Sequence, residues 1–233
     1  STPIKSSAAS DVYKRQAFNS RVVFDDVYTE GITKITSKDI KYAKEMGCDI
    51  KLLGMAKNTE DGIEAYVCPM LIPSNHPLAS VNDSYNAVFV NGDAVENAMF
   101  YGRGAGELPT ASAVVGDLFD IARNISAGCC GRIGCTCYKE IPVKKMADTH
   151  NRYFMRLIVE DRCGVLAEMT AVFAKYGVSV AQIIQKAARE AGSAEVVVIT
   201  AKVREGDFRT AMEELSGRES VRKISSMLRV YGE

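Results

Sequence analysis

A glycine-rich run is the first segment whose residues and spacing can do chemistry. Gly102-Arg-Gly104-Ala-Gly106 stands directly before a stretch with helical periodicity. Backbone N–H groups at the start of a helix attract anionic or polar ligand atoms, and glycine lets a ligand approach the backbone closely. Glycine pairs also mark ordinary turns, so the run alone is a weak signal. Its place before a helix makes it a candidate contact for a phosphate or a ribose.

A second such segment is Asp161-Arg-Cys-Gly164-Val165-Leu166. Here a glycine begins a helix close to a strand end, and the free N–H groups of that helix can hold the carboxylate of an amino acid. The alternative is that Gly164 only forms a tight turn in a structural module. The first reading is preferred because helix starts bind anions.

The cysteines form the third candidate. Four of the seven lie in one short stretch, Cys129-Cys130-Gly-Arg-Ile-Gly-Cys135-Thr-Cys137. Thiolates can hold a soft metal or form a redox pair. However, the stretch lacks the Cys-x2-Cys spacing of zinc knuckles and has no histidine nearby, so we predict a thiol-rich connector and no metal site. An odd number of cysteines without an export signal favours free thiols and a cytoplasmic protein.

Composition excludes several classes of function. The chain has 233 residues, 47% hydrophobic and 25% charged, as in soluble globular proteins. Lys plus Arg and Asp plus Glu are both 29, so no net charge attracts nucleic acid. No apolar run has the ~18 residues that span a bilayer. Neither nucleic acid nor a membrane is therefore an expected partner.

Periodicity then indicates the elements that position these segments. Residues 1–16 are polar and without period, which predicts a foreign or disordered leader. Thr36 and Asp39 suggest a capping box for a helix that ends near Gly47. Alternation and turn residues predict strands at 50–56, 63–72 and 85–90, a strand or helix at 94–101, and a helix at 112–125.

The second half has a clearer order. Residues 126–151 lose periodicity and predict an interdomain connector. Residues 152–233 then alternate as strand, helix, strand, strand, helix, strand, with strands at 154–160, 178–186, 194–203 and 221–231 and helices at 164–175 and 207–215. This βαββαβ order is that of a ferredoxin-like sandwich. We expect an α+β protein in which a mixed-sheet domain at 17–125 precedes this module.

Residues 153–231 resemble an ACT domain. The likeness rests on Leu157-Ile-Val-Glu-Asp161-Arg-Cys-Gly164-Val-Leu166-Ala and on Tyr176-Gly-Val-Ser-Val180. ACT domains bind amino acids at this glycine turn and pair through sheet edges. The resemblance implies an amino-acid effector held by Asp161, Gly164, Val165 and Leu166.

Residues 17–125 resemble the C-terminal part of the catalytic domain of homoserine dehydrogenase. The matching segments, in order along the chain, are Phe24-Asp-Asp-Val-Tyr28-Thr-Glu-Gly31-Ile, Ile50-Lys-Leu-Leu-Gly54, His76-Pro-Leu-Ala-Ser-Val81, Asn86-Ala-Val-Phe-Val90 and Tyr101-Gly-Arg-Gly104-Ala-Gly106-Glu-Leu-Pro-Thr110-Ala. The family interconverts aspartate 4-semialdehyde and homoserine with NADP or NAD, for threonine, methionine and isoleucine synthesis. The resemblance implies that Gly104, Gly106 and Thr110 face the cofactor, that His76 lies near the active site, and that threonine acts through the ACT domain.

The sequence also departs from that family. It has no Gly-x-Gly-x-x-Gly turn of a Rossmann domain ahead of residue 17. The catalytic lysine of the family falls at Ala9 here, and Lys5 and Lys14 are out of register, so no catalytic residue is assigned. The chain alone is therefore expected to be inactive and, because βαββαβ modules expose a sheet edge, to form a homodimer.

Two alternatives stay open. His76 lies between Asn75 and Pro77, and a loop-ordering hydrogen bond explains it more simply than a catalytic role. For the whole chain, the alternative is a stand-alone amino-acid-sensing ACT module on a dimerisation platform. Lys51, Asp25 and Asp26 receive no catalytic role, because a strand lysine facing solvent and adjacent aspartates on opposite faces account for them.

Overall fold

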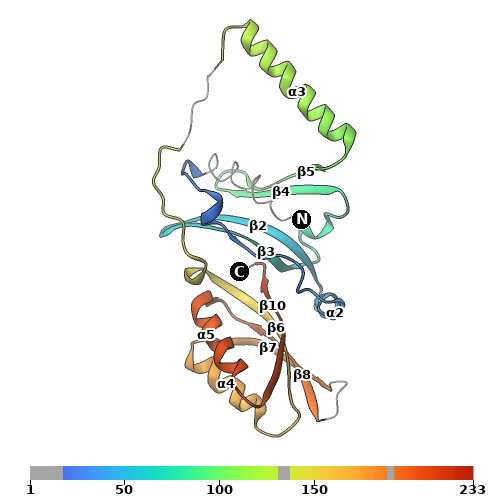
Figure 1. The fold of residues 1–233 in the computed structure, drawn as a ribbon, viewed down its shortest axis with the longest axis vertical. Helices are drawn as coiled ribbons and strands as arrows, with labels where there is room; N and C mark the ends of the chain where they lie inside the picture. The colour runs from blue at the N-terminus through green and yellow to red at the C-terminus, as the bar shows by residue number, and fades with distance from the viewer. Residues whose placement is uncertain (1–17, 131–136, 188–191, 233) are drawn as a thin grey trace. The chain divides into compact units, whose positions relative to one another are not determined.

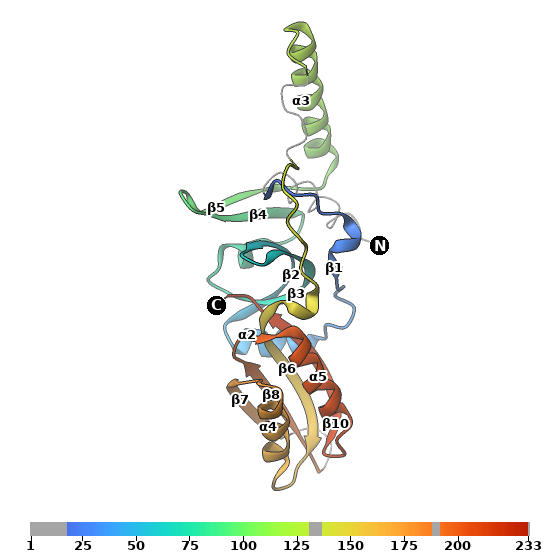
Figure 2. The same cartoon turned by 90° about the vertical axis from the view of Figure 1, so that its left-hand side faces the viewer.

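The computed structural model describes residues 18–130, 137–187 and 192–232. The chain divides into two compact units. Unit 1 comprises the residues up to Ile72 together with those from Cys137 onward, and unit 2 comprises Pro73–Thr136. The predicted leader at 1–16 lies outside the described residues. Figures 1 and 2 show the elements of both units.

The first part of unit 1 carries a helix and a long hairpin. Its elements are η1 (Phe24–Asp26), β1 (Tyr28–Thr29), α2 (Ser37–Glu45), β2 (Cys48–Thr59) and β3 (Gly62–Pro73). The predicted capping box at the start of α2 is confirmed: the Thr36 N–H donates to Asp39 Oδ2 at 2.9 Å, and the Asp39 N–H donates to Thr36 Oγ1 at 3.4 Å. The hairpin of β2 and β3 is also as predicted.

The second part of unit 1 is the predicted ferredoxin-like module. It contains, after η3 (Met146–Asp148), the elements β6 (His150–Glu160), α4 (Val165–Lys175), β7 (Val180–Ala187), β8 (Ser193–Thr200), β9 (Val203–Arg204), α5 (Glu205–Ser216) and β10 (Val221–Val230). The strand order is β10-β6-β8-β7, with antiparallel neighbours. The strand predicted at 194–203 is two strands, since β8 ends at Thr200 and β9 pairs with the start of β6.

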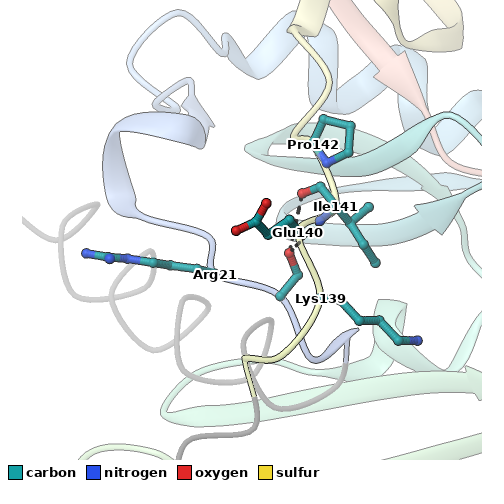
Figure 3. A pocket seen from close by; sticks show the side chains of 6 residues that line it. Arg21, Lys139, Glu140, Ile141 and Pro142 are labelled. Atoms are coloured by element: carbon teal, nitrogen blue, oxygen red, sulfur yellow. Dashed lines mark hydrogen bonds between the residues drawn. The ribbon is translucent and has the colours of Figure 1, made fainter.

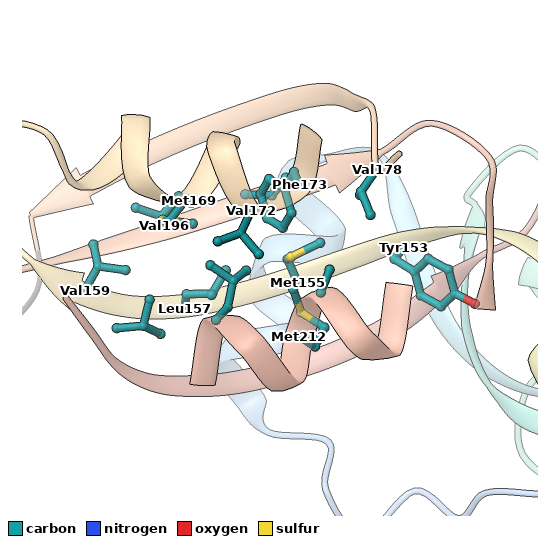
Figure 4. Packing of buried hydrophobic residues seen from close by; sticks show 14 of the residues in the cluster. Tyr153, Met155, Leu157, Val159, Met169, Val172, Phe173, Val178, Val196 and Met212 are labelled. Carbon is teal, nitrogen blue, oxygen red and sulfur yellow. The ribbon is translucent and has the colours of Figure 1, made fainter. Parts of the chain in front are cut away.

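Alternation along β6 divides the residues of this sheet between two faces. Tyr153, Met155, Leu157 and Val159 point into the core under α4 and α5, as Figure 4 shows. Their intervening neighbours point the other way, and Phe154 belongs to a second cluster. On β8, Val196 and Val198 likewise face the helices, while Val197 and Ile199 face the second cluster. Both faces of the sheet are therefore buried, one of them against α4 and α5.

The other face is covered by α2, whose Tyr42 and Ala43 pack in the second cluster with Leu71, Phe154 and Leu228. The same sheet also continues beyond β10. β3 lies parallel to β10, with Met70 opposite Arg229 and Leu71 opposite Val230, and β1 lies parallel to β3. The predicted boundary near residue 151 thus does not separate two sheets. The reason is that β3, which is buried along most of its length, pairs with β1 and β2 and also with β10.

Part of the predicted connector is built into unit 1. Ser20 pairs with Lys139 and Ile63 with Val143 as parallel bridges. The Ile63 N–H donates to the Pro142 carbonyl at 2.8 Å. Gly62 has φ of +140°, and a Cβ there would lie 2.5 Å from the Pro142 oxygen, so this close approach requires glycine. Residues 139–143 are hence part of the packed unit and not a free linker.

Unit 2 contains η2 (Pro77–Ser80), β4 (Tyr85–Gly92), β5 (Glu96–Arg103) and α3 (Glu107–Ser126). β4 and β5 form an antiparallel hairpin, so the segment predicted as strand or helix at 94–101 is a strand. α3 starts earlier than the predicted residue 112 and has no buried residue. Its large exposed apolar side chains are Leu108, Val114, Val115, Leu118, Phe119, Ile121 and Ile125. Among the described residues, none of the helices has the length and apolar character needed to cross a membrane.

Candidate functional site

The glycine-rich run leaves the end of β5 and enters α3. Gly104 donates its N–H to the Ser84 carbonyl at 3.3 Å. A Cβ on Gly104 would lie 1.6 Å from Asn86 Nδ2 and 2.6 Å from Asn86 Cγ. A side chain at this position would therefore have to displace the exposed side chain of Asn86 on β4.

Gly106 is the N-cap of α3 and has φ of +127°, a conformation that favours glycine. The Thr110 N–H donates to the Gly106 carbonyl at 3.1 Å, which closes the first turn. Pro109 has no N–H to offer, and the Glu107 carboxylate stands in the same turn. A phosphate would be repelled by that carboxylate, so the turn suits an uncharged polar group such as a ribose hydroxyl or a carboxamide oxygen better.

His76 is the N-cap of η2. Its Nδ1 accepts a hydrogen bond from the Leu78 N–H at 3.2 Å, and its ring centroid lies 4.8 Å from that of Phe89. Burial lowers the pKa of His76 below its usual value, which favours the neutral ring at pH 7. With Nδ1 accepting, the neutral ring carries its proton on Nε2. These contacts provide the loop-ordering role that the sequence favours.

His76 and Gly104 approach the same strand at different residues. His76 contacts Phe89, and Gly104 abuts Asn86. These two residues of β4 are an odd number of positions apart, so their side chains point to opposite faces of the hairpin. The structure thus anchors both predicted site segments on β4 but does not give them a common face.

The predicted effector segment forms the turn between β6 and α4. Gly164 is the N-cap of α4 in the left-handed conformation, with φ of +92°. The Asp161 N–H donates to the Gly192 carbonyl at 3.1 Å, which ties the turn to the start of β8. Val165 is buried in the core, and Leu166 packs against it. These two residues can therefore offer a ligand their backbone N–H groups but not their side chains.

An arginine borders this turn. Arg162 Nε donates to Glu160 Oε2 at 2.9 Å and its Nη2 to Glu168 Oε1 at 3.0 Å. Hydrogen bonds from Ser220 and Arg162 lower the pKa of Glu168, and hydrogen bonds with Glu160 and Glu168 raise the pKa of Arg162. Two carboxylates already neutralise this guanidinium. The free N–H groups of α4 are consequently the stronger anion-binding feature here.

Sequence reasoning missed a buried group of charges on the α2 face of the sheet. Arg156 on β6 donates to Asp39 Oδ1 at 2.9 Å and to Glu195 Oε1 at 3.0 Å. Lys38 Nζ lies 2.7 Å from the same Glu195 oxygen, and the Tyr42 hydroxyl donates to Glu195 Oε2 at 2.7 Å. We call Lys38, Asp39, Tyr42, Arg156 and Glu195 the α2 charge cluster.

Burial alone would raise the pKa of Asp39 and of Glu195. Hydrogen bonds outweigh this effect of burial at both carboxylates, so both pKa values lie below their usual range. Asp39 accepts from Thr36 and Arg156. Glu195 accepts from Lys38 and Tyr42 on α2 and from Arg156 on β6. Both carboxylates are ionised at neutral pH. The sequence does carry a sign of this cluster, because Arg156 and Glu195 are each a charged residue inside an otherwise apolar strand.

A second buried group of charges lies at the start of α5. Arg229 on β10 donates to both oxygens of Glu205, at 3.1 Å from Nε and 2.6 Å from Nη2, and to Glu30 at 3.0 Å. Tyr153 and Arg209 also donate to Glu205. We call Glu30, Tyr153, Glu205, Arg209 and Arg229 the α5 charge cluster. It joins β10 to the segment that follows β1.

The recess drawn in Figure 3 does not coincide with any predicted site. It has a volume of about 310 Å³ and is lined by Ser20, Arg21, Lys139, Glu140, Ile141 and Pro142. Ser20 Oγ accepts from the Ile141 N–H at 3.2 Å and donates to the Ile141 carbonyl at 3.3 Å. The polar groups of this recess thus join two chain segments to each other.

Five cysteines in the described part of the chain are free thiols, namely Cys48, Cys68, Cys129, Cys130 and Cys163. Cys135 lies outside the described residues, so the predicted thiol-rich connector is only partly visible. Within the described ranges, His, Cys, Asp and Glu side chains form no group suited to a metal ion.

Comparison with known proteins identifies both halves of the chain. The homoserine dehydrogenase family matches residues 10–119, and the ACT domain matches residues 153–219. Homoserine dehydrogenase of Corynebacterium glutamicum is 42% identical over 220 residues, which are 92% of this chain and 48% of that protein. The Bacillus subtilis enzyme is 36% identical over 222 residues, 95% of this chain and 51% of that protein.

Solved structures of homoserine dehydrogenases are also similar to this chain. Homoserine dehydrogenase of Thiobacillus denitrificans superposes with a TM-score of 0.90 at 33% identity, over 98% of this chain and 53% of that one. The Staphylococcus aureus enzyme gives a TM-score of 0.67 at 27% identity, over 99% of this chain and 54% of that one. The chain thus spans about half the length of these relatives. In this order along the chain, residues 10–119 are similar to the homoserine dehydrogenase family and residues 153–219 to the ACT domain.

Proposed function

We propose that this chain is part of an NADP- or NAD-dependent homoserine dehydrogenase, which interconverts aspartate 4-semialdehyde and homoserine in threonine, methionine and isoleucine synthesis. The observation that carries the proposal is the likeness to the Corynebacterium glutamicum enzyme, 42% identity over 92% of this chain. Cytoplasmic location and a homodimer are part of the proposal. Five free cysteines among the described residues, Cys48, Cys68, Cys129, Cys130 and Cys163, support the former.

The cofactor would touch this chain at the start of α3. Gly106 and Thr110 shape that turn, and its carboxylate at Glu107 disfavours a phosphate. We therefore assign the turn to the carboxamide of the nicotinamide or to its ribose, both of which are uncharged polar groups. When bound, the nicotinamide supplies or accepts the hydride. Gly104 contributes by letting Asn86 pack under the loop, and His76 contributes by ordering η2.

The groups that bind the nucleotide phosphates and move the proton are proposed to lie outside the described residues. The sequence has no Gly-x-Gly-x-x-Gly turn after a strand, and its glycine loop does not suit phosphate. The exposed apolar side chains of α3 also support a site that is completed by groups outside the described residues. A helix with this many apolar side chains is normally covered by another part of a protein. The purified chain is then expected to show no NADPH oxidation with aspartate 4-semialdehyde.

The ACT domain is proposed to bind an amino acid, threonine in the first place, at the turn of Asp161, Gly164, Val165 and Leu166. The left-handed N-cap at Gly164 and the free N–H groups after it would hold the carboxylate. This turn also serves the second candidate function, a stand-alone amino-acid sensor without dehydrogenase chemistry. The likeness along residues 10–119 favours the enzyme.

Thermal unfolding with added ligands distinguishes the two functions. A ligand that binds only the folded chain raises its melting temperature by mass action. L-Threonine is expected to raise the melting temperature of the wild type but not that of Gly164→Val, whose β-branched side chain cannot adopt φ of +92° without strain. Gly217→Ala, at a position with negative φ, is the control. A melting-temperature shift with amino acids, together with a complete lack of activity in a chimera that adds the half of a relative not matched by this chain, would favour the sensor.

A further inference from the structure

The end of the β4–β5 hairpin carries the only asparagine of the sequence that a glycine follows, Asn91-Gly92. Asn91 is exposed and pairs with Asn97 across the hairpin, and Gly92 pairs with Glu96. Only residues 93–95 lie between the two strands. Asn91 and Gly92 therefore belong to the last two pairs of the ladder, where a hairpin opens most easily.

An asparagine that precedes glycine can modify itself. The backbone nitrogen of Gly92 attacks Cγ of Asn91, the new C–N bond closes a cyclic imide, and the side-chain nitrogen leaves as ammonia with the amide proton of Gly92. Water then opens the ring at either carbonyl, which gives aspartate or isoaspartate. Glycine favours the first step because it has no Cβ to shield its nitrogen.

The closed hairpin holds the Asn91 side chain away from this reaction. Asn91 Nδ2 donates to Asn97 Oδ1 at 2.8 Å. Ring closure requires the side chain to leave Asn97 and to turn back toward the Gly92 nitrogen. The end of the ladder must therefore open before Asn91 can react.

Glu96 makes this opening easier. Its φ is +55°, in the left-handed region that costs free energy for a residue with a side chain. Glycine usually takes the left-handed position at the end of a short hairpin loop. The strain at Glu96 is released when the last pairs of the ladder separate, so it favours the open form in which Asn91 reacts.

We propose that Asn91 is a self-modification site, which closes an imide with Gly92 and becomes aspartate or isoaspartate at a rate set by Glu96 and Asn97. The product adds a negative charge beside Asp93 and Glu96. Isoaspartate also lengthens the main chain by one carbon, so the modified hairpin loses the pairing of residue 91 with Asn97. The inference does not depend on the proposed enzyme function.

Incubation of the 233-residue chain at neutral and at mildly alkaline pH, followed by peptide mass mapping, tests the proposal. Asn91 is expected to gain the mass difference between a hydroxyl and an amino group, and chromatography should separate an aspartate from an isoaspartate form of its peptide. Asn86 is the internal control, because it is exposed on the same strand but precedes Ala87. Conversion of Asn86 as fast as that of Asn91 would overturn the proposed site.

Three variants test the route and its control by the hairpin. Gly92→Ala should lose most of the conversion, and its Cβ meets nothing within 4 Å, so the fold is kept. Glu96→Gly should slow conversion about two- to five-fold, because it removes the strain that favours opening. Asn97→Ala should speed conversion about two-fold or more, because no side chain then holds Asn91 in the closed hairpin.

Each result bears on a different part of the proposal. No conversion of Asn91 in the wild type overturns it as a whole. An unchanged rate in Gly92→Ala overturns the imide route. Unchanged rates in both Glu96→Gly and Asn97→Ala overturn the control of the reaction by the end of the hairpin.

Discussion

Replacing Glu205 by glutamine is expected to destabilise unit 1 severely. The side chain is 2% exposed and accepts hydrogen bonds from Arg229, Arg209 and Tyr153. Glutamine keeps the shape but loses the charge, so Arg229, itself 5% exposed, keeps only the half-buried Glu30 as an ionic partner. Breaking a buried pair from one side costs about 3–5 kcal/mol, so we expect a loss of that size in the free energy of unfolding.

Urea unfolding followed by far-ultraviolet circular dichroism measures this loss. Glu213→Gln is the matched control, because Glu213 lies on the same helix but is exposed, and such changes stay within about 0.5 kcal/mol. A loss below about 1 kcal/mol in Glu205→Gln, with Glu213→Gln unchanged, would refute the view that the α5 charge cluster depends on this carboxylate.

The pH dependence of the free energy of unfolding tests the Glu205–Arg229 pair in a second way. Burial would raise the pKa of Glu205, but Arg229 and the other donors outweigh it, so the pKa lies below the usual 4.5. The unfolded chain therefore takes up the proton first as the pH falls. The stabilisation is complete above about pH 4.5 and is lost as the pH falls through the folded pKa. The stability difference between wild type and Glu205→Gln is expected to shrink below that pH and to stay constant above it, and growth of the difference on acidification would contradict the assignment.

Three further outcomes follow from the packing. Gly104→Ala should destabilise unit 2 by about 1 kcal/mol or less, because its Cβ displaces only the exposed side chain of Asn86, with Gly92→Ala, which meets nothing within 4 Å, as control. Hydrogen exchange of the β4–β5 hairpin reports the change, and full rescue by adding Asn86→Ala is expected. Leu157→Ala should lower the free energy of unfolding in urea by about 2–5 kcal/mol, because the side chain is fully buried under α4 and α5. Leu166→Ala is the control, since Leu166 is only partly buried, and a smaller loss for Leu157→Ala than for Leu166→Ala would contradict the core assignment. Cys163 and Cys130 are both exposed and should react with a thiol reagent at once. Cys68 is fully buried, which raises its pKa to about 11, so it should react only on unfolding. Peptide mass mapping locates the label, and early labelling of Cys68 would disprove its burial.

Local patterns were sufficient for most elements of this fold. The apolar stripes of α4 and α5, the alternation along β6 and β8 and the Thr36–Asp39 capping box each lie within one short segment. The βαββαβ order could therefore be predicted from the sequence. Pairing between β3 and β10 could not, because it joins residues near 70 to residues near 229 and leaves only an apolar run as a local sign.

The candidate sites show the same limit. Asp39 is predicted as a capping residue, and it caps α2, yet its second partner Arg156 lies 117 residues away. Gly104 stays a predicted ligand contact, and the sequence gives no sign that Asn86 lies beside it, because only the hairpin register brings the two together. Gly164 is different, since its place directly before α4 is what its own segment predicts. The role of a residue whose partner lies far away in the sequence could be recognised only from the structure.

Activity of a chimera tests the central claim most directly. The half of the Corynebacterium glutamicum homoserine dehydrogenase that this chain does not match would be joined ahead of residue 10, where the family match begins, and assayed for NADPH oxidation with aspartate 4-semialdehyde. The account predicts turnover by the chimera and none by the 233-residue chain alone. A folded chimera that binds NADPH but shows no turnover would contradict the assignment of this chain to the enzyme, as would turnover by the chain without the added half.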